Sequence, residues 1–231
     1  MTRHQFFIEQ TKHFTADALC VPDMALALRN DCKEGAWYLG ETSYGSRLQF
    51  IAVKFSRRLA GHNFGSVAAG TPLGQLWFVP IAGGIGSDEH GNEIRLPLNL
   101  VYYTVLKNSS SNKSGSLINF GQKATLVQSQ GYDYREVIWT PVFRKKSATI
   151  DGEAVSYYVL DWLYQLPEQM DAATYKRVEQ VVEVLRSPDE LAKLFDPNLE
   201  ATTRCVDGLT APEMTALMEN LKALPQGEMV F

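Results

Sequence analysis

Residues 135–166 constrain the fold more than any other stretch, because two β-like runs meet there at Asp151-Gly152. Aspartate followed by glycine between such runs is a strong hairpin signal, since both central residues of the turn must tolerate positive φ. A two-residue turn pairs Ile150 with Glu153, and this register assigns every side chain of both strands to one of two faces. The sequence therefore predicts a long β-hairpin of defined register.

One predicted face of this hairpin is large and apolar, and we expect it to form core because exposing it would be costly. It carries Val137, Trp139, Pro141 and Phe143 opposite Leu166, Tyr164, Trp162 and Leu160. The other face is mixed and basic at one end, with Arg144 and Lys146 opposite Val159 and Tyr157, and with Thr140, Val142 and Asp161 further along. Because proline cannot donate to a ladder, the strand is expected to be at an edge or bulged at Pro141.

The preceding sequence also has β character. Residues 47–58 read as a long strand that is partly apolar on both sides, and residues 76–81 and 96–106 read as the next two strands. Residues 61–74 and the Ser/Asn/Lys-rich residues 107–116 are expected to be loops, the latter flexible. Residues 117–120 and 124–127 are interpreted as short strands. The glycines at 83–86 lack a G-K-[ST] motif, so a hairpin connection is a better account than a phosphate-binding loop.

Helical patterns lie at the two ends of the chain. Residues 22–30 suit a short helix that begins at Pro22, although their alternation would equally suit a strand. After Pro167, apolar residues recur at helical spacing behind Asp171, and two capping-box patterns begin at Ser187 and Thr210. These three helices need a partner for their apolar faces, which is either the β core or another chain.

The expected fold class is α+β, with a mainly antiparallel β body that is either an OB-like barrel or a β-sandwich. We divide the chain into an N-terminal helical segment (1–36), a β domain (37–167) and a C-terminal helical appendage (168–231). The appendage is expected to pack on the β domain or on a partner.

Composition places the chain among ordinary globular proteins, with 45% hydrophobic and 21% charged residues. No run is long and apolar enough for a membrane span, and residues 1–12 lack a signal-peptide core, so we expect a cytoplasmic protein without membrane contact. Three cysteines without C-x-x-C spacing indicate neither a disulfide framework nor a zinc site. We expect no metal and no cofactor.

Charge is unevenly distributed along the chain. Residues 43–148 carry a net charge of +7, whereas residues 149–231 carry −9. Basic side chains that share a face with tyrosines could follow phosphates while the aromatic rings stack on bases, which predicts single-stranded nucleic-acid binding. The candidate contact residues are Arg57, Arg58, Lys107, Lys113, Tyr132, Tyr134, Arg135, Arg144, Lys145, Lys146 and Tyr157.

This layout resembles that of single-stranded-DNA-binding proteins, which combine an OB body with an acidic C-terminal part and often a terminal phenylalanine, as Phe231 is here. The resemblance is one of organisation and includes no family motif. In this chain the acidic part is helical and apolar enough to fold.

The alternative is a protein-interaction or assembly module, in which exposed aromatics and the C-terminal helices bind another protein. An enzyme is the less favoured class. The four histidines, His4, His13, His62 and His90, lie in dissimilar contexts without a Ser or Cys nucleophile motif beside them, so we assign no catalytic residue.

Overall fold

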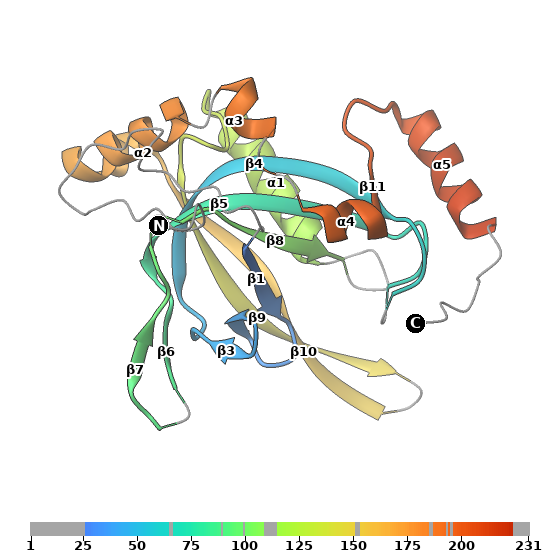
Figure 1. The fold of residues 1–231 in the computed structure, drawn as a ribbon, viewed down its shortest axis with the longest axis horizontal. Coiled ribbons are helices and arrows are strands. Elements are labelled where there is room, and N and C mark those ends of the chain that lie inside the picture. The colour runs from blue at the N-terminus through green and yellow to red at the C-terminus, as the bar shows by residue number, and fades with distance from the viewer. Residues whose placement is uncertain are drawn as a thin grey trace.

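The computed structural model describes residues 26–64, 67–88, 90–98, 100–108, 115–150, 153–184, 187–192, 194 and 196–223. These residues form an α+β fold with one large, mainly antiparallel sheet and a few helices (Figure 1). The strands are β1 (Leu26–Asp31), β2 (Ala36–Leu39), β3 (Thr42–Ser43), β4 (Leu48–Ala60), β5 (Pro72–Gly83), β6 (Ile85–Ser87), β7 (Glu93–Arg95), β8 (Tyr102–Lys107), β9 (Ile138–Ile150), β10 (Glu153–Gln165) and β11 (Thr203–Cys205). The helices are α1 (Ser116–Ser129), the 3-10 turn η2 (Pro167–Gln169), α2 (Ala172–Val184), α3 (Pro188–Ala192), α4 (Pro197–Thr202) and α5 (Ala211–Ala223).

The large sheet has nine strands in the order β10-β9-β4-β5-β8-β1-β2-β3, with β11 paired to β4. Its pairs are antiparallel except for β1 with β8, which is parallel. Within the described residues the ladder is not closed, but a backbone hydrogen bond of 2.7 Å runs from Tyr158 N on β10 to Cys32 O in the β1–β2 turn. The sheet therefore curls until β10, at one end of the strand order, meets the turn between β1 and β2 near the other end.

The predicted hairpin and its register are confirmed. Ile150 pairs with Glu153 and Trp162 with Pro141, as expected from a two-residue turn, although Asp151 and Gly152 lie outside the described residues. The apolar face is core, since Trp139 and Trp162 are both 0% exposed. β9 pairs with β4 only at its first two residues, so at Pro141 the strand is already an edge on that side.

Apolar clusters cover both faces of the large sheet because its central strands alternate between two apolar sets. On the first face Phe50, Phe78 and Trp139 pack with Phe120 of α1. On the opposite face Ile51, Val53, Trp77 and Ile138 pack with Val178 and Val181 of α2. The long strand predicted over residues 47–58 is confirmed as β4, and its two apolar sides are explained by this double coverage.

Two expectations about local structure are wrong. Residues 26–31 form strand β1 and not the end of a helix, because their alternation points Leu26 and Leu28 into the core while β1 pairs with β2 and β8; residues 22–25 lie outside the described residues. The two short strands expected at 117–120 and 124–127 belong to one helix, α1, whose buried Phe120 and Val127 lie seven residues apart on one face.

The helices after Pro167 contact the β body at separate places. α2 packs on the sheet through the second apolar cluster, and α5 buries Leu221 in a small cluster with Leu59 and Val206. At Thr210 one half of the expected capping box is present, because Glu213 Oε2 accepts hydrogen bonds from the Thr210 amide and hydroxyl at 2.8 and 2.7 Å. None of the described helices combines the length and the apolar character needed to cross a lipid bilayer.

Candidate functional site

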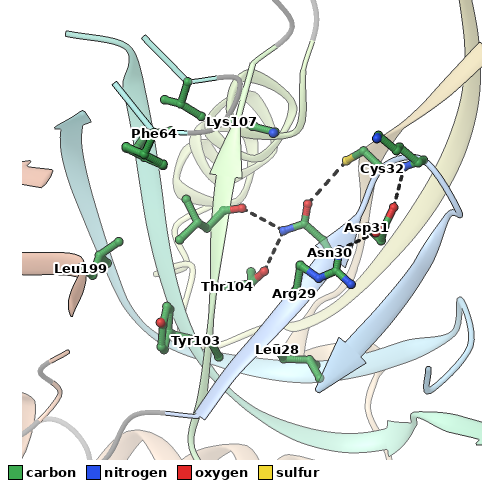
Figure 2. A pocket seen from close by; sticks show the side chains of 15 residues that line it. Leu28, Arg29, Asn30, Asp31, Cys32, Phe64, Tyr103, Thr104, Lys107 and Leu199 are labelled. Carbon is green, nitrogen blue, oxygen red and sulfur yellow. Dashed lines mark hydrogen bonds and ion pairs between the residues drawn. The ribbon is translucent and has the colours of Figure 1, made fainter. Parts of the chain in front are cut away.

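A groove opens where β1 and β8 separate. The two strands pair only through Leu26 with Tyr102 and Ala27 with Tyr103, and beyond these residues they diverge. The resulting cavity of about 530 Å³ is bordered on its far side by Phe64 in the β4–β5 loop (Figure 2). The volume is in the range of pockets that bind small organic ligands.

The two sides of the groove differ in character (Figure 2). Phe64, Tyr103 and Leu199 line one side with apolar and aromatic surface. Arg29 and Asn30 line the opposite side, and Lys107 lies at one end. A planar ligand with an anionic substituent would match this combination, because its ring would meet apolar surface while its charge met cations.

Asn30 holds the diverging strands at a fixed separation. Its Nδ2 donates to Thr104 Oγ1 at 2.7 Å and to Val105 O at 2.9 Å. Its Oδ1 accepts a weak hydrogen bond from Cys32 Sγ at 3.6 Å. Burial raises the pKa of the Cys32 thiol more than nearby Lys107 lowers it, so Cys32 stays protonated and is not an activated nucleophile.

Asp31 fixes the turn that carries Lys33 at the rim of the groove. Its Oδ1 accepts from the amides of Lys33 and Glu34 at 2.8 and 3.0 Å, and its Oδ2 lies 2.6 Å from Arg29 Nη1. Burial raises the pKa of Asp31, but these two amides and Arg29 together lower it below its ordinary value. Among the described residues, three cations line the groove, namely Arg29, Lys33 and Lys107, and Asp31 is the one carboxylate that lines it with them.

The apolar side is completed by α4. Tyr103 Oη donates a hydrogen bond to the buried carboxylate of Asp196, which caps α4 by accepting from the Asn198 amide at 2.9 Å. Burial and this hydrogen bond raise the pKa of Tyr103 well above its usual range, so the phenol stays neutral. The contact holds α4 beside β8 and places Leu199 in the wall of the groove.

The structure brings only part of the predicted nucleic-acid contacts near the groove. Lys107 lines it. Four others lie on the outer part of the β9–β10 hairpin, residues 144–149 and 153–159, which we call the arm; they are Arg144, Lys145, Lys146 and Tyr157. The three cations of the arm are exposed and Tyr157 is half-buried.

Arg57, Arg58 and Arg135 are held by neighbouring acidic side chains. Arg58 is only 4% exposed, donates from Nε to Thr203 Oγ1 at 2.6 Å and forms an ion pair with Glu200 at 2.5 Å. Arg135 pairs with Asp133 at 2.8 Å, and Arg57 lies 3.8 Å from Asp207. Arg58 in particular supports the fold and is not presented to a ligand.

The predicted tyrosines lie away from the groove, and Lys113 lies outside the described residues. Tyr134 Oη accepts a hydrogen bond from the Phe55 amide at 3.1 Å. Tyr132 Oη donates to Glu168 at 2.8 Å, and this hydrogen bond raises its pKa. Tyr132 borders a separate cleft of about 720 Å³ that also contains Tyr175 and three glutamates. That cleft repels phosphate groups.

Sequence reasoning missed Arg29, Lys33, Phe64 and Tyr103. Arg29 and Lys33 lie in or just after the segment read as a helix, and Phe64 lies in a loop that carried no further signal. An alternating interpretation of residues 26–31 would have placed Arg29 and Asp31 together on the face opposite Leu28.

Two absences complete the description of the site. Within the described ranges, no group of three or more His, Cys, Asp or Glu side chains could hold a metal ion. The chain matches no family model, no curated protein and no solved structure.

Proposed function

We propose that this chain binds single-stranded nucleic acid, with bases against Phe64 and the neighbouring apolar wall and phosphates near Lys33 and Lys107. The observation that carries the proposal is the groove itself, which combines an aromatic wall with an excess of cations. Proteins that bind single strands combine these two features, because every base has a face that stacks and every nucleotide carries a phosphate.

We further propose that the β body is an OB-like barrel whose closure is interrupted by the β1–β2 hairpin, which precedes the barrel strands in the chain. β4, β5 and β8 form a meander, α1 follows, and β9 returns beside β4 with β10 as its hairpin partner. OB folds have this order and bind ligands on their second and third strands, here β5 and β8. The β1–β2 hairpin occupies the gap between β8 and β10, which leaves the Tyr158–Cys32 hydrogen bond between them.

The position of the groove agrees with this interpretation. In OB folds the loop between the first two strands and the loop between the last two flank the ligand. Here the β4–β5 loop supplies Phe64 to the groove, and the β9–β10 hairpin approaches its rim at Cys32. The ligand class expected for an OB groove is an oligonucleotide or an oligosaccharide, and the excess of cations favours the nucleic acid.

Binding of labelled single-stranded oligonucleotides, followed by fluorescence anisotropy over a range of salt concentrations, tests the proposal. The affinity should fall steeply with salt, because phosphate contacts release counterions. Replacing Lys33 and Lys107 together by alanine should flatten the salt slope by roughly 1.4, at about 0.7 for each phosphate contact to a single strand. Phe64→Ala should weaken binding by about 1 to 3 kcal/mol if the ring stacks on a base.

The matched control removes two cations that do not line the groove. Lys123→Ala with Lys176→Ala changes the net charge equally but acts on α1 and α2, so the salt slope should stay close to that of the parent. If the salt slope flattens equally in the Lys33/Lys107 and the Lys123/Lys176 variants, binding depends on overall charge and the groove is not the binding site. Absence of binding to both DNA and RNA at low salt would end it.

The alternative, an assembly module, is supported by the cleft beside α2. It is lined by Tyr132, Tyr175 and the carboxylates of Glu136, Glu179 and Glu183, a surface that suits a cationic protein segment. The same experiments separate the two functions. An assembly module would show no salt-sensitive oligonucleotide binding, and light scattering would detect an oligomer or a complex.

A further inference from the structure

We infer that the bound strand leaves the groove across the β1–β2 turn and continues along one face of the arm, where it contacts Arg144, Lys146 and Tyr157 but not Lys145. This inference rests on the proposed function and extends it from one groove to a two-part site. Three observations support it: a direct contact between groove and arm, the alternation of side chains, and the charge on the selected face.

The rim of the groove touches the base of the arm. Cys32 and Lys33 line the groove, and Cys32 O accepts the hydrogen bond from Tyr158 N on β10 at 2.7 Å. Gly35, at φ +70°, lies so close to the arm that a Cβ atom there would be 3.1 Å from the Tyr158 ring. A bound nucleic-acid strand that passes Lys33 therefore reaches the arm without crossing a gap.

Alternation decides which face of the arm continues the groove. On β8 the apolar cluster that contains Phe120 takes Tyr102 and Leu106, whereas Tyr103 and Lys107 lie on the opposite face of the sheet, which we call outward, and line the groove there. On the hairpin, Phe143 and Leu160 pack in this same cluster. Successive side chains of a strand point to opposite faces, so the even-numbered residues of β9 and the odd-numbered residues of β10 are outward on the arm.

The outward face of the arm carries Arg144, Lys146 and Tyr157, the apolar residues Ala148, Val155 and Val159, and Glu153 at the far end of β10. Of these, Arg144, Lys146 and Tyr157 are the side chains suited to contact phosphates and bases. Lys145 is directed to the other face, where its register partner Tyr158 packs edge-on against Phe143 with ring centroids 6.4 Å apart.

The two cations of the outward face differ in how available they are to a phosphate group. Arg144 Nε lies 3.5 Å from Asp161, which reduces its availability to a phosphate. Lys146 is exposed and lies directly opposite Tyr157, so an ammonium group and an aromatic ring are adjacent. From Tyr158 to the end of β10 at Glu153 the arm adds about 17 Å of track at roughly 3.3 Å per residue.

The test compares two neighbouring lysines on two lengths of oligonucleotide. Lys146→Ala and Lys145→Ala each remove one charge from adjacent positions on opposite faces. A short strand of about 4 nucleotides and a long strand of about 12 cover the range of roughly 4 to 16 that OB units bind. For the long strand, Lys146→Ala should weaken binding about threefold to tenfold and flatten the salt slope by about 0.7, while Lys145→Ala leaves both near the parent values.

The short strand separates this inference from the proposed function. It fills the groove alone, so both lysine variants should bind it like the parent protein, whereas the Lys33/Lys107 double variant should not. If the long strand loses affinity equally with Lys145→Ala and Lys146→Ala, or with neither, the path along the outer face is wrong although the groove still binds. If neither strand binds the parent protein at low salt, the proposed function fails and this inference fails with it.

Discussion

The buried half of the β9–β10 hairpin and its arm share one register but have different surroundings. In the buried half, residues 138–143 and 160–165, Pro141 pairs with Trp162. The ring centroids of Trp162 and of Phe120 on α1 are 5.0 Å apart. In the arm Lys146 pairs with Tyr157, and here Lys146 is exposed and Tyr157 is only half-buried. Strand pairing alone decides which side chains share a face. The elements around that face decide whether its residues stabilise the fold or remain accessible.

The largest expected effect is the loss of Trp162. Its ring is 0% exposed and its Nε1 donates to Ser116 O at 3.1 Å. Trp162→Ala should lower the free energy of unfolding by about 3 to 5 kcal/mol, because a large core side chain leaves a cavity. Urea denaturation followed by circular dichroism measures the change. Lys146→Ala should change the free energy of unfolding by no more than about 0.5 kcal/mol, and equal losses for the two variants would contradict the contrast between the two halves of the hairpin.

A smaller effect is expected where the arm meets the β1–β2 turn. Gly35→Ala places a side chain in the left-handed region, which costs about 1 to 2 kcal/mol, and also crowds the Tyr158 ring. Gly40→Ala is the control, because its φ of +60° is similar and nothing lies within 4 Å of the new methyl group. Gly35→Ala should therefore be the more destabilising of the two in thermal unfolding. Equal melting temperatures would mean that the arm does not depend on this contact.

The smallest effect concerns pH at the same turn. Because the pKa of folded Asp31 is lowered, the stability from its carboxylate is fully present above the unfolded pKa of about 4 and is lost as pH falls through the folded pKa. The parent protein should be more stable than Asp31→Asn at neutral pH, and the difference should shrink in acid. Denaturation series at several pH values measure it. A difference that does not change with pH would show that the charge of Asp31 plays no part.

The hairpin could be predicted from the sequence because the residues that determine it are close together in the chain. Asp151-Gly152 sets the register, and the alternation of Trp139 and Phe143 with polar residues identifies the core face. The helix α1 was misread because its apolar residues fall in short runs that suit either structure. For such runs the packing of Phe120 against Trp139 and Trp162 decides the outcome, and this contact is not visible in the sequence.

The groove could not be predicted, because it is created by the separation of two strands far apart in the chain. Ala27 pairs with Tyr103, and nothing near either residue signals this parallel pairing. Arg58 shows the same limit for charge. It belongs to a basic stretch that suggests a working surface, yet Gln75, Thr203 and Glu200 surround it inside the fold.

The contact between Tyr103 and Asp196 also bears on the biosynthesis of the protein. Domains begin to fold while the ribosome is still extending the chain from its N-terminus. The strands that carry Arg29 and Tyr103 emerge early, whereas Asp196 and Leu199 emerge only after most of the printed sequence has been translated. The nascent sheet can therefore form before the apolar wall of its groove is complete, and that wall is completed only late in translation, when α4 has reached Tyr103.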